Sequence, residues 1–359
     1  MNKEIFSHFE ERGHEQISFF YCPVTKLKAI VAIHNTVLGP SLGGCRMKLY
    51  DSEEQAIEDV ARLAEGMTYK SSIAGMDLGG GKACIIADNK MTEGRVELFT
   101  QFGKYLNRLS GKYYTAEDMG TKVSDMRVIK SQTPYCVGFP IEDGGSGDPS
   151  PWTAMGVFKS MTVFADEVLK KDLSELKVAV EGVGNVGYSL VRSLVNAGAK
   201  VTVSDINNES TARAKKELGV EVVDPKNIYN VDCDIFSPCA IGQTINTDTL
   251  KVLKAKTILG AANNQLKDKS IYKILEDKKI IYCPDFVVNA GGVISVGAEL
   301  VEGGWKQEWV INKVQNIAKT LIEVIKRSEQ ENKFSEEIAL TMAKERIARK
   351  ANSANSISC

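Results

Sequence analysis

Hydrophobic and polar positions follow two different periods along this chain, and together they predict a succession of strands and helices. An apolar run at 27–33 indicates a buried strand, whereas apolar residues at helical spacing over 56–64 indicate an amphipathic helix. Ser52 with Gln55 three residues later resembles a capping box and marks the start of that helix, which we expect to end at Gly66. The first part of the chain therefore reads as an α/β domain.

Three consecutive glycines precede a lysine in the stretch 66–82, GMTYKSSIAGMDLGGGK. The glycines, at 79–81, are unsuited to a helix or strand interior, so we expect a sharp turn or a close backbone approach there. Lys82 then opens an apolar run that reads as a buried strand, and partial desolvation of an ammonium favours its neutral form. Lys82 could therefore act as a base, although a solvated lysine beside a flexible loop fits the same pattern.

A second pattern lies in the middle of the chain, where an apolar strand runs into the GxGxxG glycines Gly182, Gly184 and Gly187. A helix over 188–197 and a second strand ending at Asp205 follow. This order is typical of a Rossmann unit, in which the glycines make the turn, admit the pyrophosphate and pack helix on strand. The carboxylate of Asp205 would bind ribose hydroxyls and repel a 2′-phosphate, so NAD is favoured over NADP.

Further apolar strands, expected at 235–236, 257–259 and 280–282, continue the αβ alternation. In open α/β sheets the ligand lies at the carboxyl ends of the strands. The candidates at those ends are Cys239, Ala240, Ala262 and Asn263. A glycine-rich turn is expected at 289–297, and helical spacing returns over 310–324.

The cluster GGSGDPSP at 144–151 is the densest group of glycine and proline in the chain and predicts a domain crossing. A chain of 359 residues is also longer than one hydrophobic core usually organises. We therefore predict two domains, 1–146 and 147–329, with helices at about 330–359 returning to the first.

The composition mainly excludes certain partners and certain kinds of site. The chain is 43% hydrophobic and 25% charged, with a formal charge of −1, so nucleic acid and anionic membranes are not expected partners. We see no signal peptide and no apolar run of about 20 residues. Eight cysteines are scattered without a CxxC pair, which favours a cytoplasmic protein with free thiols and no metal site. Only three histidines occur, so the expected acids and bases are lysines and carboxylates.

A set of motifs links these parts in one order between about residues 27 and 300: LGGCRM, GMTYK, LGGGK, TAEDMG, GDPSPWTA, EGVGNVG, AANNQL and PDFVVNAGGVISV. In kind and spacing they resemble the amino-acid dehydrogenase superfamily of glutamate, leucine, phenylalanine and valine dehydrogenases, most closely its leucine dehydrogenase branch. The resemblance implies an amino-terminal α/β substrate and oligomerisation domain and a Rossmann NAD-binding domain, with a cleft between them. It also implies a homo-oligomer, either an octamer or a dimer, that acts on small molecules.

The resemblance assigns a role to each matched residue. Lys82 matches the catalytic lysine that activates water, Asp118 the acid that exchanges protons with the amino group, and Lys70 the lysine that pairs with the substrate carboxylate. A cation at Lys70 would help to keep Lys82 unprotonated. The other substrate-binding positions are Leu42, Gly43, Gly44, Met67, Gly79, Ala116, Val293 and Val296. The cofactor-binding positions are Gly182, Gly184, Asn185, Val186, Gly187, Asp205, Thr153, Cys239, Ala240, Ala262, Asn263 and Asn289.

The matched side-chain pocket is apolar. In the glutamate-specific branch a lysine and a serine hold the γ-carboxylate, whereas Leu42 and Val296 stand at those places here, so a glutamate side chain would lack a polar partner. The expected activity is reversible, NAD-dependent oxidative deamination of a branched-chain L-amino acid, leucine and also valine or isoleucine, to the 2-oxo acid and ammonia. The alternatives are a valine or phenylalanine dehydrogenase and a non-catalytic NAD-binding sensor.

Three places depart from the leucine branch. Met76-Asp77 stands where that branch reads Leu-Asn, Asp148 where it reads Asn, and Gly297-Ala298 where it reads Ala-Asp. The first and third lie near pocket residues, so they leave the exact substrate preference open. Neither removes a catalytic group.

Overall fold

The chain forms two compact α/β units in the computed structural model, which describes residues 6–357. The first unit consists of the described residues up to Pro149, residues 293–310, and those from Met342 onward. The second consists of Ser150–Gly292 and Ile311–Thr341. The prediction had assigned 293–310 to the dinucleotide-binding domain, whereas the structure groups this segment with the first unit.

Hydrogen bonds explain that grouping. The carboxylate oxygen Oε1 of Glu299 accepts the backbone N–H of Gly138 at 2.8 Å and that of Ser146 at 2.7 Å. Because a partly buried carboxylate needs such donors, these bonds tie 293–310 to the loop that precedes the unit boundary.

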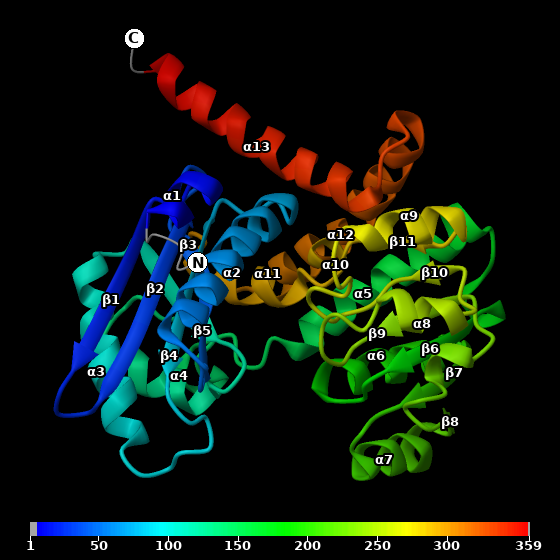
Figure 1. The fold of residues 1–359 in the computed structure, drawn as a ribbon, viewed down its shortest axis with the longest axis horizontal. Coiled ribbons are helices and arrows are strands. Elements are labelled where there is room, and N and C mark those ends of the chain that lie inside the picture. The colour runs from blue at the N-terminus through cyan, green and yellow to red at the C-terminus, as the bar shows by residue number, and fades with distance from the viewer. Residues whose placement is uncertain (1–5, 358–359) are drawn as a thin grey trace. The chain divides into compact units, whose positions relative to one another are not determined.

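The first unit is built on a five-stranded sheet (Figure 1). In order of pairing, its strands are β1 (Gln16–Cys22), β2 (Leu27–Asn35), β4 (Gly79–Ile86), β3 (Ser41–Lys48) and β5 (Tyr113–Glu117). Strand β2 is antiparallel to both β1 and β4, whereas β3 is parallel to β4 and β5. The carboxyl ends of β4, β3 and β5 therefore lie along one edge. The helices of this region are α1 (Ser7–Arg12), α2 (Glu53–Ile73), α3 (Arg95–Leu106) and α4 (Val123–Lys130).

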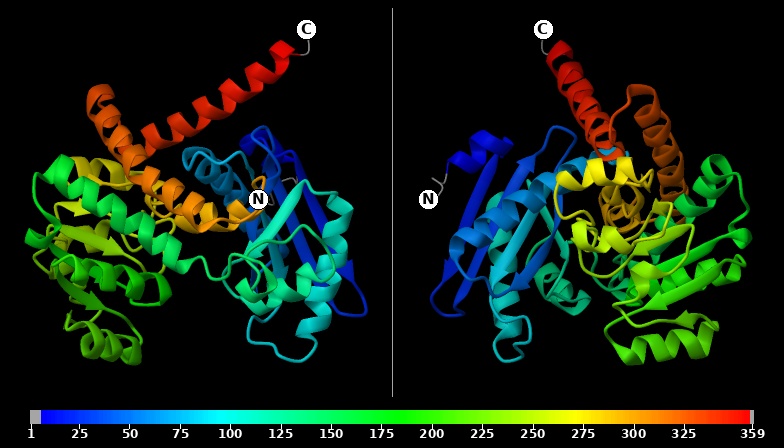
Figure 2. Two further views of the ribbon diagram at one scale, coloured as in Figure 1. Left: turned by 180° about the vertical axis from the view of Figure 1, so that it is seen from behind. Right: turned by 45° about the vertical axis from the view of Figure 1, so that its right-hand side comes forward.

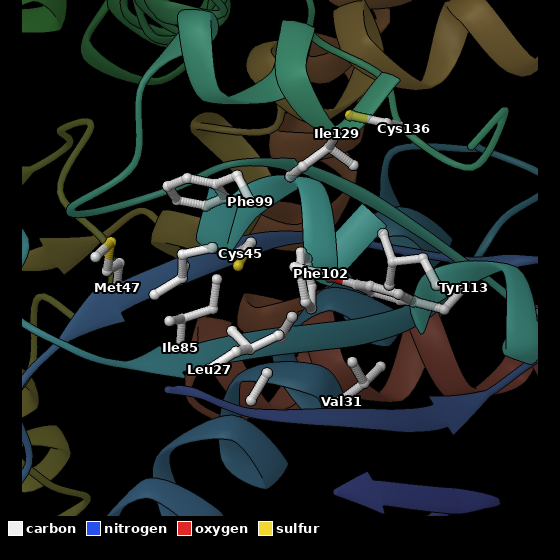
Figure 3. Close-up of a cluster of buried hydrophobic side chains, with 14 of the residues drawn as sticks. Leu27, Val31, Cys45, Met47, Ile85, Phe99, Phe102, Tyr113, Ile129 and Cys136 are labelled. Carbon is white, nitrogen blue, oxygen red and sulfur yellow. The ribbon is translucent and has the colours of Figure 1, made fainter. Parts of the chain in front are cut away.

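Helices cover both faces of this sheet (Figures 1 and 2). On one face α2 packs Ala56, Val60 and Ala64 against strands β2 and β4. On the other, α3 contributes Phe99 and Phe102 to a larger core (Figure 3). Fully burying a phenylalanine stabilises a fold by about 1.5 to 3 kcal/mol, so this second layer holds much of the unit's stability.

Two predictions for the stretch 66–82 were wrong. Helix α2 does not end at Gly66 but runs to Ile73, because one exposed glycine costs a helix only about 1 kcal/mol. The glycines at 79–81 lie inside β4 and not in a turn. The predicted close approach is confirmed, since a Cβ atom added to Gly80 would lie 2.0 Å from the backbone nitrogen of Thr68.

The second unit holds a six-stranded sheet in which all pairs are parallel. Its strands, in order of pairing, are β8 (Glu221–Val222), β7 (Lys200–Ser204), β6 (Lys177–Glu181), β9 (Ile235–Pro238), β10 (Thr257–Ile258) and β11 (Ile281–Tyr282). This is the strand order of a Rossmann fold, which confirms that prediction. Its helices are α5 (Ser150–Phe164), α6 (Asn185–Asn196), α7 (Asn208–Leu218), α8 (Thr247–Val252), α9 (Ser270–Asp277) and α10 (Asp285–Val288).

Three helices complete the chain: α11 (Gly291–Gly297), α12 (Gln307–Glu331) and α13 (Ser335–Ile357). The glycine-rich turn expected at 289–297 was wrong, since α11 occupies most of it. Gly291 is needed there for packing, because an added Cβ atom would lie 1.9 Å from the carbonyl oxygen of Trp152. The helix predicted over 310–324 is confirmed as part of α12.

Two further observations concern the state of the cysteines and the character of the helices. Seven cysteines are free thiols, and Cys359 lies outside the described residues. Within 6–357, no helix combines the length and the apolar character that a membrane crossing requires.

Candidate active site

Lys82 and Asp118 come together from the two strands that flank β3. Lys82 lies within β4, and Asp118 follows the last residue of β5. The Nζ atom of Lys82 is 2.9 Å from Oδ1 of Asp118, and Nε of Arg46 on β3 donates to Oδ2 at 2.9 Å. Each oxygen of this carboxylate therefore has a cation of its own. Lys82 is only 5% exposed, whereas the Asp118 side chain is 22% exposed, so the lysine is shielded from water and the carboxylate is partly accessible.

The two adjacent acids differ in their protonation. Burial by itself raises the pKa of Asp118, but the charges and hydrogen bonds of Lys82 and Arg46 outweigh burial and hold the pKa below its ordinary value. In contrast, burial and repulsion from Asp148 raise the pKa of Glu117 to about 7. Asp118 is therefore ionised at neutral pH, while its neighbour titrates there.

The sequence analysis gave no role to the residues that hold Asp118 in place. Arg46 also pairs with Asp59 of α2, with NH1 3.0 Å from Oδ2, and the Tyr50 hydroxyl donates to the same Oδ2 at 2.9 Å. The sequence did contain a signal that Arg46 belongs to the site. Arg46 lies two residues after Gly44 and four after Leu42, so its side chain is on the same face of β3 as theirs. A charge on a buried face requires a partner.

The expected side-chain pocket is apolar, and its residues belong to the first unit. All four are nearly fully buried: Leu42, Ala116, Val293 and Val296. A Cβ atom added to Gly138 would lie 3.3 Å from Cγ1 of Val296 and 3.9 Å from Cβ of Ala116. Gly138 thus lies beside both Val296 and Ala116, which belong to two segments far apart in the chain.

The other expected substrate positions lie around the same strands. A Cβ atom added to Gly44 would lie 2.8 Å from Cβ of Asp118, so glycine at this position avoids a clash with the Asp118 side chain. One added to Gly43 would lie 3.4 Å from Cγ of Met67, and one added to Gly79 would lie 2.0 Å from the carbonyl oxygen of Asn35. Lys70 lies in the last turn of α2, the helix that packs on β4.

In the second unit, each glycine of the fingerprint does a distinct task. Gly182 has φ +94°, which only glycine adopts readily, and an added Cβ atom would lie 2.8 Å from the nitrogen of Ala240. Gly184 caps α6, and no described atom lies within 4 Å of an added Cβ there. Gly187 packs so tightly that its Cβ would lie 2.0 Å from the oxygen of Gly182. The open face at Gly184 fits a pyrophosphate at the helix amino terminus, beside Asn185 and Val186 of the first turn.

Asp205 follows β7 and faces the same turn. Its Oδ2 accepts the backbone N–H of Val183 at 2.7 Å, and its Oδ1 accepts that of Asn207 at 2.8 Å. These bonds fix the carboxylate while leaving lone pairs that can accept ribose hydroxyls.

A group of residues at the carboxyl ends of β9 and β10 fits a nicotinamide. The Nδ2 atom of Asn289 donates to Oδ1 of Asn263 at 2.9 Å and to the carbonyl oxygen of Ala261 at 3.0 Å. Asn289 is 2% exposed, and its Oδ1 has no hydrogen-bond partner among the described residues. A buried acceptor of this kind fits a donor such as a carboxamide group.

The remaining cofactor candidates surround that edge. The N–H of Cys239 donates to the oxygen of Glu181 at 2.7 Å, and that of Ala262 donates to the oxygen of Pro238 at 2.8 Å. Thr153 lies in the first turn of α5. Within residues 6–357, no group of three or more His, Cys, Asp or Glu side chains is arranged to hold a metal ion.

Two family models match most of the chain. One, described as Glu/Leu/Phe/Val dehydrogenase, dimerisation domain, covers residues 14–135. The other, described as Glutamate/Leucine/Phenylalanine/Valine dehydrogenase, covers residues 144–209 and 202–354. Together they span both units.

Individual relatives are similar over nearly their whole length. A leucine dehydrogenase of Bacillus cereus is 47% identical over 98% of this chain and 96% of its own. A phenylalanine dehydrogenase of Caldalkalibacillus thermarum is 42% identical over 94% of this chain and 92% of its own. Among solved structures, an L-tryptophan dehydrogenase from Nostoc punctiforme has a TM-score of 0.83 at 37% identity and covers 97% of this chain and 99% of its own.

Proposed function

Because this chain belongs to the Glu/Leu/Phe/Val dehydrogenase family, we propose that it catalyses NAD-dependent oxidative deamination of branched-chain L-amino acids, with leucine as the best substrate. The observation that carries this proposal is the apolar set Leu42, Ala116, Val293 and Val296, which is buried in the same unit as the Lys82–Asp118 pair. A carboxylate side chain would be desolvated there without a partner, which disfavours glutamate by several kcal/mol on general grounds.

Similarity supports leucine over phenylalanine. The leucine dehydrogenases of Bacillus cereus and Geobacillus stearothermophilus are each 47% identical to this chain, against 42% for the phenylalanine dehydrogenase. Since one methylene is worth only about 1 to 3 kcal/mol in an apolar pocket, valine and isoleucine are expected as further substrates. A valine or phenylalanine dehydrogenase is the alternative within this family.

The proposed chemistry divides among three side chains. Lys70 binds the α-carboxylate of the substrate, and Asp118 takes a proton from the substrate ammonium. Bound NAD supplies the acceptor for the hydride that leaves Cα. Lys82 then removes a proton from water as the water attacks the resulting iminium carbon, and passes that proton to solvent. Asp118 returns its proton to the amino group, and Lys82 takes the hydroxyl proton as the carbonyl forms and ammonia leaves. The sum is amino acid, water and NAD⁺ to 2-oxo acid, ammonium, NADH and a proton.

The ion pair in the structure gives this sequence a starting point. The substrate ammonium would displace Lys82 from Oδ1 of Asp118. Without that anionic partner, Lys82 would release its proton to solvent, and its neutral nitrogen could then accept a proton from water. Arg46 would keep Asp118 ionised before the substrate binds and favour return of the proton that Asp118 accepts, because its Nε donates to Oδ2.

NAD is proposed as the cofactor from residues of the second unit. The family implies a nicotinamide cofactor, and Asp205 supports NAD because a carboxylate at this place would repel a 2′-phosphate. Gly184 and the first turn of α6 would hold the pyrophosphate, and Oδ1 of Asn289 would accept from the carboxamide. A non-catalytic NAD-binding sensor would not need Lys82, Asp118 or Lys70. If the chain were such a sensor, it would bind NAD but turn over no amino acid.

We also propose a homo-oligomer that works in the cytoplasm. Strand β1 lies at the edge of its sheet and exposes Phe19 and Tyr21, and the family model that covers it is described as a dimerisation domain. The free thiols at seven cysteines fit a reducing compartment. Light scattering during gel filtration would measure the oligomer, and a monomeric mass would contradict it.

A panel of substrates tests the main proposal. NADH absorbance would be followed after separate additions of L-leucine, L-isoleucine, L-valine, L-phenylalanine and L-glutamate, with NAD or NADP. The highest kcat/KM is expected for leucine with NAD. A preference for glutamate would contradict the pocket assignment, and binding of NAD without turnover of any amino acid would favour the sensor.

A further inference from the structure

Gly297 is a glycine for reasons of space and not of backbone conformation. Its φ of −69° and ψ of −23° are helical, so any residue could adopt them, and a glycine in a helix is ordinarily less favourable than alanine. A Cβ atom added there would lie 2.8 Å from Cε of Met76, 2.9 Å from Cδ1 of Leu78 and 3.6 Å from Cδ2 of Leu42. Three buried side chains therefore converge on the place where a methyl group would stand.

The backbone of Met76 is held on both sides, so only its side chain can adjust to this contact. Its N–H donates to the oxygen of Ser71 at 3.0 Å, and its own oxygen accepts from NH1 of Arg346 at 2.7 Å. The NH2 atom of Arg346 also pairs with Oδ1 of Asp77 at 2.7 Å. Helix α13 thus holds the turn between α2 and β4, and the Met76 side chain, 2% exposed, has to point inward.

The same contact reaches the substrate pocket through Leu42. Leu42 is fully buried, and it meets the Met76–Gly297 contact through its δ-methyl group. Val296, another pocket residue, directly precedes Gly297 in α11. A methyl group at position 297 would therefore lie against Leu42, and it would be attached to the residue that follows Val296.

We propose that Met76 and Gly297 act as a pair of positioning residues that set the depth of the apolar pocket by supporting Leu42. This inference rests on the proposed function and adds residues that determine the choice among aliphatic substrates. Methionine is unbranched and flexible, so its side chain can fill the space beside Gly297 and change conformation when that space changes. A methyl group at position 297 pushes Met76 against Leu42 and makes the pocket shallower, which favours valine over leucine.

The test compares Gly297→Ala, Met76→Ala and the double variant, with kcat and KM measured for L-leucine, L-valine and L-norleucine. Gly297→Ala is expected to lower the leucine-to-valine ratio of kcat/KM at least fivefold, mainly through KM, and the double variant to return it to within twofold of the parent. Met76→Ala alone is expected to raise the norleucine-to-valine ratio. Gly66→Ala, which adds a methyl group to an exposed helical glycine, should change neither ratio.

Several outcomes would overturn the inference. An equal loss for all three substrates in Gly297→Ala without recovery in the double variant would show a merely structural effect. If Gly297→Ala does not fold, the Met76→Ala norleucine ratio decides, and an unchanged ratio contradicts the pair. Failure of the parent protein to oxidise any of the three amino acids would refute the proposed function, whereas normal parent turnover with unchanged ratios in all variants would refute this inference alone.

Discussion

The ammonium of Lys82 and the carboxylate of Asp118 form an ion pair across β3, the strand that separates β4 from β5 in the sheet, with Nζ 2.9 Å from Oδ1. Because the proposed chemistry passes a proton through each of them, Lys82→Ala should lower kcat for leucine by about a thousandfold or more, as expected for loss of a general base. Steady-state kinetics measures it. The control is Lys28→Ala, which breaks an exposed ion pair of the same length with Glu53 and should leave kcat unchanged. Intact turnover in Lys82→Ala would remove the lysine from the mechanism.

Arg46 is expected to tune Asp118. Arg46→Gln removes a cation that lowers the pKa of this acid, so the pKa should rise and the acidic limb of the pH profile of kcat/KM should move to higher pH. The matched control is Arg62→Gln, because Arg62 also pairs with Asp59, at 3.0 Å, but makes no bond to Asp118. If both variants gave the same profile, the contact between Arg46 and Asp118 would be structural only.

Asp205 should decide the cofactor. Asp205→Ser keeps a small polar acceptor near the N–H of Val183 and removes the negative charge, so the NADP-to-NAD ratio of kcat/KM should rise at least about tenfold. Rates with each cofactor at saturating leucine measure this change. An unchanged ratio would mean that another residue excludes the 2′-phosphate.

Two glycines of one stretch should respond in opposite ways to alanine. At Gly80 the new Cβ atom would lie 2.0 Å from the Thr68 nitrogen, so Gly80→Ala should destabilise the protein by about 3 kcal/mol or prevent folding. At Gly66 no described atom lies within 4 Å, so Gly66→Ala should stabilise α2 by about 0.5 to 1 kcal/mol. Thermal unfolding compares them, and equal effects would contradict the close approach of α2 and β4.

Glu336 should make stability depend on pH. Burial and repulsion from Asp285 raise its pKa from 4.5 to about 7, so the folded state binds a proton that the unfolded state has released over this interval. Stability from this group is therefore present below about pH 4.5 and is lost as pH rises through 7. Glu336→Gln keeps an acceptor for the Tyr272 hydroxyl and should be more stable than the parent at pH 8.5, by on the order of 1 kcal/mol, but not at pH 5. Melting temperatures at the two pH values measure the difference, and Glu329→Gln, at an exposed position, is the control.

The sequence predicted the parts of this protein that depend on local order. The Rossmann unit is such a part, because strand, glycines, helix and Asp205 follow one another within about 30 residues. For the glycines of β4 the sequence left a sharp turn and a close backbone approach open. The close approach is that of Thr68 from the preceding helix, a partner that the local pattern does not contain. Arg46 received no role for the same kind of reason: its partners Asp59 and Asp118 lie 13 and 72 residues away and meet it only after folding.

The glycines of β4 also limit how this protein can evolve. Any substitution of Gly79 or Gly80 adds a Cβ atom that would push a helix or a neighbouring strand away. This strand therefore cannot change at these two positions by single small substitutions. The apolar residues around Leu42 and Met76 meet flexible side-chain ends instead, and these can yield. New substrate ranges are therefore expected to arise in descendants of this sequence by exchange of pocket residues, while the backbone beneath the lysine is inherited unchanged.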